Sequence, residues 1–167
     1  MKKSLVWIAF TILLFALFGC IFNNSLQKST VEVLLTDAPL TEIDKLTVDI
    51  TGFSYHYSYE DVLGNEIGIW ATPTNIATTV DILSLAGTEV SWLTIDVPVP
   101  STITQIRLVI DAATVTTTDS TESYPITIPN KEVKIPKADI TIPNDGQLLL
   151  DFDILRSLKY QNGVGYR

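Results

Sequence analysis

Along most of the chain, apolar and polar residues alternate in short runs separated by Pro, Gly, Asn and Asp. This period-two pattern is typical of β-strands that bury one face and expose the other. The first two runs cover residues 31–35 and 46–51. The same pattern predicts further strands at 67–70, 90–97, 104–110, 114–118, 124–128, 132–135, 139–142 and 147–153.

Two local signals interrupt this pattern. At Gly52 the apolar positions change from even to odd numbers, and such a slip requires an extra residue, so we expect a β-bulge and a kinked strand there. The segment VDILSLAG (residues 80–87) predicts one short helix around 81–86, with Asp81 as N-cap and Gly87 closing it.

Eight or more short strands with frequent turn signals predict an all-β fold, an antiparallel Greek-key β-sandwich of immunoglobulin-like or transthyretin-like type. The roughly 140 residues from 31 to 167 suit a single domain with one core. Prolines fall where strands are expected to end, and there the missing N–H breaks no ladder. These prolines are Pro98, Pro100, Pro125, Pro129, Pro136 and Pro143.

The first residues have the layout of an export signal. Lys2 and Lys3 precede an apolar run from residue 5 to residue 18. This run is short for a membrane span, which needs roughly 20 apolar residues. We therefore expect residues 1–19 to be a signal peptide, with an uncleaved N-terminal anchor as the alternative.

Cys20 is the only cysteine, so no disulfide can form within the chain. Its position after Leu17, Phe18 and Gly19 resembles the lipobox of bacterial lipoproteins. That resemblance implies that Cys20 carries acyl chains such as palmitate and becomes the new N-terminus, with residues 20–30 forming the lipidated tether. The expected location is the cell envelope, outside the cytoplasmic membrane. In the alternative, the signal is cleaved and the cysteine is incidental.

The net charge of the exported part limits which partners it can bind. Without residues 1–19 the chain carries nine basic and 19 acidic residues, a net charge of roughly −10. Nucleic acid and anionic lipid both attract basic surfaces, so neither is expected as a partner. Attachment to a membrane must then come from the acyl chains.

Four segments, taken in order, resemble one family: VLLTDAP (33–39), VDILSLAG (80–87), ITQIRLVIDAATV (103–115) and LLLDFDILRSL (148–158). Together they are similar to the domain of unknown function 4382 family of bacterial and archaeal secreted lipoproteins. The resemblance implies a β-sandwich displayed outside the cytoplasmic membrane, and it implies no particular activity.

No catalytic constellation is evident. A Ser or Cys nucleophile needs a base, whereas the single histidine is His56 and the single cysteine is the expected lipidation site. We therefore expect no enzyme and no resident cofactor. A pair of carboxylates leaves glycoside hydrolysis as a less favoured alternative.

Carboxylates at strand ends and turns suggest a Ca²⁺ site, because this cation prefers hard oxygen ligands. The candidates are Asp37 in the TDAP turn, Asp111 at a strand end, and Asp151 and Asp153 of the DFD segment. In the competing interpretation, Asp37 caps its turn and Asp151 pairs with Arg107 or Arg156; we favour this one.

An aromatic stripe supplies the second candidate site. Tyr55, Tyr57 and Tyr59 share one face of a strand, and Trp70 follows shortly after, so these rings could form a flat platform for sugar rings or a protein. The alternative, which we favour, packs the stripe into the core. We expect a non-enzymatic binding or adhesion module for a glycan or envelope protein, or else a structural envelope lipoprotein that acts only through protein contacts.

Overall fold

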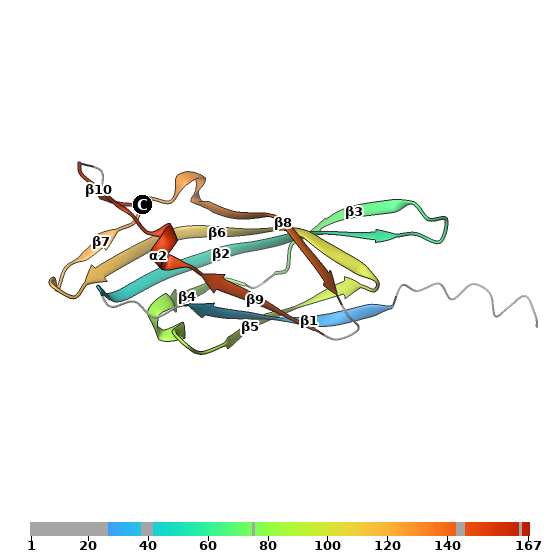
Figure 1. Ribbon diagram of the computed structural model, residues 1–167, viewed down its shortest axis with the longest axis horizontal. Coiled ribbons are helices and arrows are strands. Elements are labelled where there is room, and N and C mark those ends of the chain that lie inside the picture. The colour runs from blue at the N-terminus through green and yellow to red at the C-terminus, as the bar shows by residue number, and fades with distance from the viewer. Residues whose placement is uncertain (1–26, 38–41, 75, 143–145, 164) are drawn as a thin grey trace, which may run out of the picture.

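The computed structural model describes residues 27–37, 42–74, 76–142, 146–163 and 165–167. Most of its strands form two facing sheets, so the predicted β-sandwich is confirmed (Figure 1), and a separate two-stranded sheet lies near the C-terminus. One sheet has the order β5-β1-β9, with β1 (Lys28–Asp37) between β5 (Val90–Pro98) and β9 (Gly146–Phe152). The strand β1 begins three residues before the run predicted at 31–35. The expected signal peptide and Cys20 lie outside the described residues.

The other sheet is built on two long strands, β2 (Ile43–Glu60) and β6 (Ser101–Thr117), which pair antiparallel along nearly their whole length. Shorter strands extend this sheet on both sides. On the β2 side these are β3 (Glu66–Ala71) and β4 (Thr78–Asp81), and on the β6 side β7 (Ser123–Pro125) and β8 (Glu132–Ile142).

The core lies between the sheets and follows the alternation of the sequence. Each fully buried aliphatic side chain contributes about 1.5–3 kcal/mol relative to its exposed state, so this layer holds the sheets together. Its members come from both sheets and from the turn after β4. The residues with at most 2% exposure are Val31, Val33, Leu35, Leu46, Ile50, Phe53, Ile82, Val97, Ile103, Ile106 and Val115.

The bulge expected at Gly52 is confirmed. Ile50 pairs with Ile110 and Gly52 with Val109, so β2 has one extra residue between these two pairs. A Cβ added at Gly52 would lie 2.7 Å from Val109 Cγ2, which explains why glycine occupies this position. The slip turns the aromatic stripe that follows toward the core.

Two expected strand breaks are wrong. The runs predicted at 104–110 and 114–118 form the single strand β6, and those at 132–135 and 139–142 form β8. Asp111 lies inside β6 as an extra residue, because Ile110 pairs with Ile50 and Ala112 with Asp49. Pro136 lies inside β8, which within the described residues pairs only with β6, so its missing N–H can face away from the ladder.

The sandwich is not purely antiparallel, because β1 and β9 run parallel. Apolar alternation is the same for both directions, so the sequence pattern could not reveal this. Of the strand predicted at 124–128, only residues 124 and 125 lie in a strand, the three-residue β7. Pro143 lies outside the described residues.

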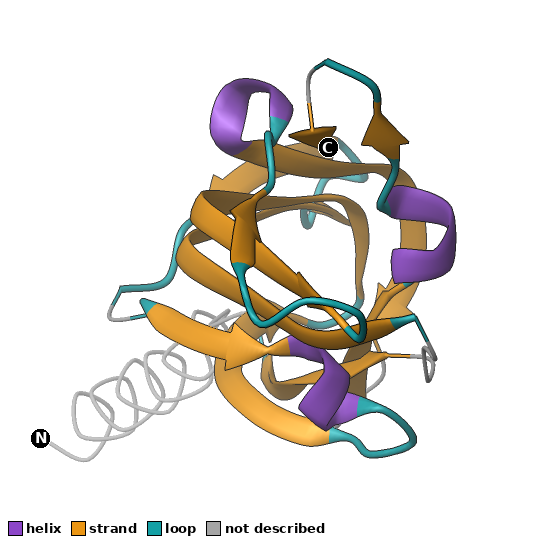
Figure 2. Cartoon of the chain, turned by 90° about the vertical axis from the view of Figure 1, so that its left-hand side faces the viewer, coloured by secondary structure: helices purple, strands orange, loops and turns teal. Residues whose placement is uncertain are grey.

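Among the described residues, helical structure is limited to short turns at the periphery of the sheets (Figure 2). The helix expected around 81–86 is a 3₁₀ turn, η1 (Ile82–Leu85), and Gly87 follows with φ +70°. Asp81 precedes it but does not cap it through its side chain, which instead accepts a 3.4 Å hydrogen bond from Leu46 N. The others are η2 (Pro129–Lys131) and α2 (Ile154–Ser157), and the short strands β10 (Tyr160–Gln161) and β11 (Gly165–Tyr166) follow α2. In the described part of the chain, no helix is long and apolar enough to cross a membrane.

Candidate functional site

The aromatic stripe of β2 faces the interior. Tyr55 is 3% exposed, and its hydroxyl donates a 3.2 Å hydrogen bond to the carbonyl of Asp96. Burial raises the pKa of Tyr55 to about 12, and it also raises the pKa of the half-buried Tyr57. Tyr59 continues the stack, with its ring 6.2 Å from that of Tyr57. The alternative of a core-packed stripe is therefore the one that the geometry supports.

Trp70 lies on the opposite face of the same sheet. In the β2–β3 hairpin Tyr55 pairs with Ala71 and His56 with Trp70, so Trp70 shares the outer face with His56. The platform expected from Tyr55, Tyr57, Tyr59 and Trp70 is thus not formed. The pairing register of the hairpin decides the face, and the spacing in the sequence does not specify that register.

Trp70 instead belongs to a polar group on the outer face. The Arg107 guanidinium lies 4.0 Å from the Trp70 ring centre, and the His56 ring lies 5.3 Å away on the other strand. His56 Nδ1 is 2.6 Å from the Thr104 hydroxyl. A cation–π contact at half-exposed positions contributes about 0.5–1 kcal/mol, so it favours this placement of the Arg107 guanidinium over the Trp70 ring.

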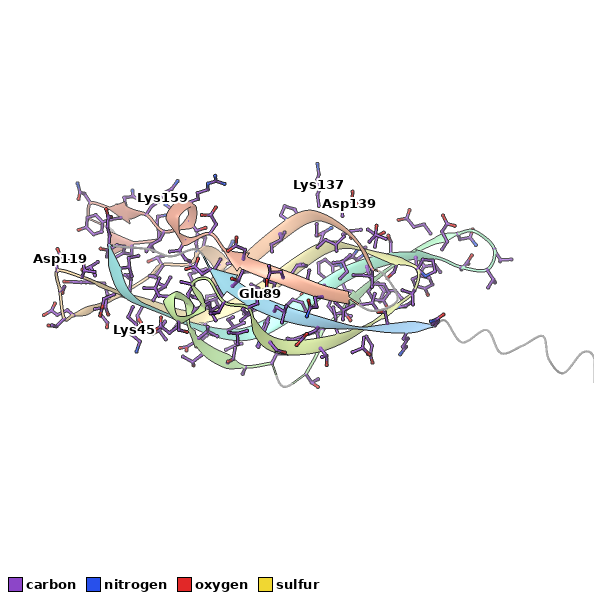
Figure 3. The ribbon with its side chains drawn as sticks, turned by 60° about the horizontal axis from the view of Figure 1, so that its bottom comes forward. Lys45, Glu89, Asp119, Lys137, Asp139 and Lys159 are labelled. Atoms are coloured by element: carbon purple, nitrogen blue, oxygen red, sulfur yellow. The ribbon has the colours of Figure 1, made fainter. Side chains whose placement is uncertain are left out.

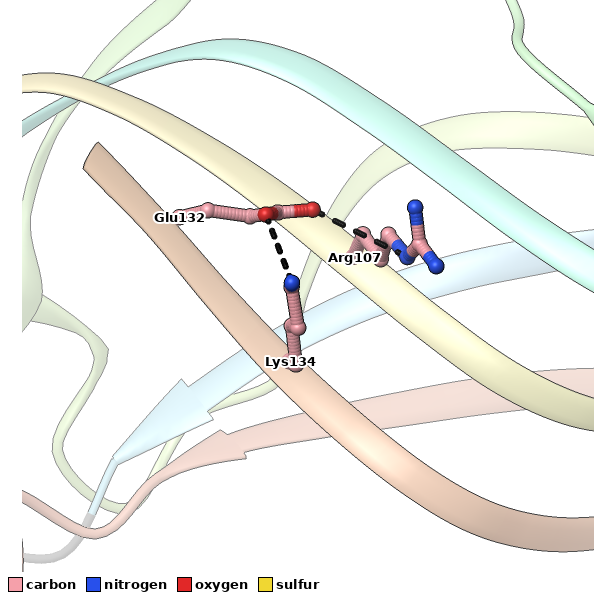
Figure 4. Close-up of polar contacts among 3 residues, drawn as sticks. All are labelled: Arg107, Glu132 and Lys134. Carbon is pink, nitrogen blue, oxygen red and sulfur yellow. Dashed lines mark ion pairs between the residues drawn. The ribbon is translucent and has the colours of Figure 1, made fainter. Parts of the chain in front are cut away.

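An ion-pair network continues this group across β6 and β8. Glu132 lies between Arg107, at 3.7 Å from Nε, and Lys134, at 3.1 Å from Nζ (Figure 4). All three side chains are partly exposed, so the network contributes little to stability. It leaves the outer face polar, with two cationic side chains sharing one carboxylate.

The four candidate Ca²⁺ ligands are not gathered. Asp37 is 4% exposed at the end of β1, where its carbonyl accepts a hydrogen bond from Gly87 N. Asp111 forms a 2.7 Å ion pair with Lys131. Among the described residues, no group of three or more His, Cys, Asp and Glu side chains could hold a metal ion.

The other two carboxylates lie near α2. Asp153 accepts a hydrogen bond from Arg156 N and pairs with the Arg156 guanidinium at 3.4 Å, while Asp151 is exposed on β9. Because Arg107 pairs with Glu132 and Arg156 with Asp153, neither arginine forms the pair that was predicted with Asp151.

An apolar cavity of about 300 Å³ lies between the sheets on the side where β8 and β9 are the edge strands. In the described residues β8 pairs only with β6 and β9 only with β1, so the sandwich stays open between them. Polar groups, among them Asp151, Asp153 and Arg167, occur beside an otherwise aliphatic wall. The apolar part of the lining consists of Leu46, Val48, Leu108, Ile110, Ala113, Ile126, Ile128, Pro129, Val133, Ile135, Leu150, Phe152, Ile154 and Leu158.

A second hollow, which we call the tyrosine cleft, is lined by residues of β7, β10 and β11 and of the end of β6 and the turn that follows it. Figure 1 shows β7 and β10 at the same end of the molecule. The volume of the cleft is about 670 Å³. Figure 3 places Asp119, one of its residues, at the extreme of the long axis. The cleft is lined by Thr117, Asp119, Ser120, Tyr124, Pro125, Tyr160, Gly165 and Tyr166.

Backbone pairing brings the three tyrosines of the cleft together. Tyr160 pairs with Tyr166 across the β10–β11 hairpin, and Thr127 N donates to the Tyr166 carbonyl at 2.8 Å. The Tyr166 ring lies 5.2 Å from that of Tyr160 and 6.2 Å from that of Tyr124. Tyr160 is 64% exposed and Tyr124 38%, so their rings are accessible.

Polar groups border these rings. The Tyr124 hydroxyl is 3.3 Å from the Ser120 hydroxyl, and Thr117 donates a 2.6 Å hydrogen bond to Asp119. Exposed aromatic faces beside hydroxyl and carboxylate groups suit a ligand that is apolar on one side and hydroxylated at its edge. The strand pattern did not reveal this site, because its members come from three segments separated by up to about 50 residues.

The two-sheet architecture and its apolar interior place the chain in the class of all-β sandwich proteins. The chain belongs to the family described as domain of unknown function (DUF4382), which matches residues 28–167. The match begins at the first residue of β1 and covers every described strand. No curated protein and no solved structure matches the chain.

Proposed function

We propose that this protein is a lipid-anchored envelope protein outside the cytoplasmic membrane, and that its sandwich is a non-enzymatic binding module whose ligand is a glycan. The observation that carries the ligand assignment is the tyrosine cleft, with accessible rings beside Asp119 and Ser120. We therefore place the ligand at the tyrosine cleft and not at the aromatic stripe of β2, because Tyr55 of that stripe is buried.

The anchoring part of the proposal rests on the sequence around Cys20. An apolar run follows two lysines and ends at the only cysteine, in the order that resembles a lipobox. One acyl chain gives only marginal membrane binding, and two or more anchor a protein stably. In a lipoprotein-processing bacterial host, we expect the N-terminal peptide to begin at Cys20 with the mass of acyl chains, and Cys20→Ser to lose that mass. An unmodified N-terminal peptide would refute the anchor.

The glycan part rests on the chemistry of the cleft. A sugar ring presents C–H groups on its face and hydroxyls around its edge, and tyrosine rings with neighbouring hydroxyl and carboxylate groups complement both. Asp119 already accepts from Thr117, but a carboxylate has further lone pairs for ligand hydroxyls. The cleft also lies at a tip of the molecule, where a polymer can approach without crossing a sheet.

A polysaccharide panel tests this assignment. We expect Tyr160→Ala and Tyr124→Ala to weaken retention of the full chain on whichever glycan it binds. The matched control is Tyr59→Ala, which removes a tyrosine from the far end of β2. Equal loss in the control, or retention unaffected by the cleft variants, would remove the cleft from consideration.

The apolar cavity supports a second candidate, the envelope protein that acts through protein contacts. A cavity beside two sheet edges with available backbone groups suits an extended apolar segment of a partner, because such a segment can pair with an edge and place side chains inside. We expect Ile135→Asp, which places a charge in the cavity wall, to abolish copurification with an envelope protein. The Tyr160→Ala variant should leave that interaction unchanged.

A further inference from the structure

The turn between β2 and β3, residues 61–65, presents two aliphatic side chains to water. Val62 is 76% exposed and Leu63 is 81% exposed, more than any other large apolar residue described. We call residues 61–65 the hairpin tip. Adjacent aliphatic residues at the end of a projecting hairpin form an exposed apolar patch, and such patches are often contact sites.

Hydrogen bonds fix the hairpin tip in this shape. One Asp61 carboxylate oxygen accepts from Leu63 N at 2.8 Å and Asn65 N at 2.9 Å, and the Asn65 side chain also donates to this carboxylate. Gly64, at φ +79°, donates its N–H to the Asp61 carbonyl. Because Asp61 is turned toward the backbone of the loop, the two aliphatic side chains are held at the apex.

The hairpin tip projects from the end of the molecule at which β1 begins. Figures 1 and 3, which share the long axis, both show the β2–β3 hairpin reaching past the start of β1 at that end. Only residues 21–27 separate Lys28, the first residue of β1, from Cys20. A fully extended chain of this length spans at most about 25 Å.

We propose that Val62 and Leu63 insert into the apolar margin of the lipid surface to which the chain is tethered, as a second membrane contact that orients the domain. This inference rests on the membrane attachment proposed above. The tether keeps the hairpin tip close to the bilayer, so insertion is effectively intramolecular and two aliphatic side chains suffice to bias the orientation.

Charge specifies the kind of lipid surface. Glu60 and Glu66 occupy paired positions at the base of the hairpin tip, and Asp61 lies within it, with no Lys or Arg among residues 53–71. Anionic headgroups would repel these carboxylates, with a range set by the Debye length. The partner is therefore a surface of net-neutral headgroups, and anionic lipid should weaken the contact.

The test uses the full chain reconstituted into phosphatidylcholine vesicles, where either acyl chains on Cys20 or the apolar run of residues 5–18 holds it. Two variants each add one tryptophan: Leu63→Trp at the hairpin tip and, as the matched control, Tyr160→Trp at the opposite end. Bromine on the acyl chains quenches tryptophan that enters the bilayer, and subtracting the unmodified chain removes the native signal. We expect the added emission to be quenched for Leu63→Trp and unchanged for Tyr160→Trp.

A second measurement keeps the native residues of the hairpin tip. We expect energy transfer from native tryptophans to a dye on the lipid headgroups to fall in the double variant Val62→Ser/Leu63→Ser, because the domain is no longer held against the surface. Replacing about a third of the lipid by phosphatidylglycerol should lower the quenching of Leu63→Trp, and added salt should restore it.

Equal quenching of the two tryptophan variants, or none in either, overturns the proposal; so does energy transfer that is unchanged in the serine variant. In these cases the hairpin tip faces water or binds a protein. The mass of the N-terminal peptide is measured on the same preparations. The apolar run attaches the full chain to vesicles even when Cys20 carries no lipid, so the hairpin-tip contact can be measured in either case. The peptide mass then reports on lipidation at Cys20, and the quenching reports on the hairpin-tip contact.

Discussion

Replacing Gly52 by alanine tests the bulge that turns the second half of β2. A Cβ at this position would lie 2.7 Å from Cγ2 and 2.8 Å from Cβ of Val109, the directly paired residue on β6. Real Cβ contacts are essentially never this short, and Val109 is β-branched and stiff at χ1. Both long strands would have to separate locally, and overpacking of this kind costs about 1–3 kcal/mol.

A second substitution, at Val109, separates the stability cost of this contact from other effects of Gly52→Ala. Val109 is 42% exposed, so Val109→Ala alone should cost less than about 1 kcal/mol. It also removes the γ-carbon that collides with the added methyl. We therefore expect the double variant to recover part of the loss, with a favourable coupling of about 1 kcal/mol between the two positions.

The assay is urea unfolding of the four proteins of this cycle, each lacking residues 1–19 and carrying Cys20→Ser. For a domain of this length, a loss of 1–3 kcal/mol also lowers the thermal midpoint by roughly 2–10 °C. A Gly52→Ala variant as stable as the parent, or a loss that Val109→Ala leaves unchanged, would show that close approach to β6 is not why glycine occupies the bulge.

Three further predictions concern neighbouring parts of β2 and its hairpin. Adding a Cβ at Gly68, which would lie 2.8 Å from His56 Nε2, should cost less than Gly52→Ala in the same urea assay, because the imidazole can rotate away; an equal or larger cost would refute this. Burial raises the pKa of Tyr55 from 10.0 to about 12, so stability should be constant below about pH 10 and fall as pH rises toward 12, a loss that Tyr55→Phe should reduce. Hydrogen bonds from the Asn65 side chain and backbone lower the pKa of Asp61, so the carboxylate should titrate below its usual range by NMR. The protection of the amides that donate to it, after correction for the intrinsic pH dependence of amide exchange, should be lost only as pH falls through that lowered pKa.

The sequence predicts those features of the fold that depend on neighbouring residues. The slip of apolar phase at Gly52 occurs within a few positions and specifies a bulge whatever the partner strand. The turn before Gly87 is likewise local, although it forms as a 3₁₀ turn and Asp81 bonds elsewhere. The alternation also identified which residues of β1 enter the core.

Features that depend on a partner strand were predicted poorly. Asp111 and Pro136 read as strand ends in isolation, but pairing with β2 and β6 carries each strand through the interruption. The parallel direction of β9 and the face occupied by Trp70 are also properties of pairing. A register shifted by one residue would have placed Trp70 beside Tyr55, as the sequence-based expectation required.

The tyrosine cleft and the hairpin tip lie near opposite ends of β2. This strand begins near the tyrosine cleft, where Ile43 pairs with Thr117, and it ends at the hairpin tip. Its 18 residues span at most about 60 Å. A domain held at the bilayer through its hairpin tip would therefore present the cleft several tens of ångströms away from the lipid. Under the two proposals above, a strongly acidic protein could serve at a membrane, because its contact with lipid would require only acyl chains and two aliphatic side chains. Its carboxylates would keep the rest of the domain away from anionic headgroups.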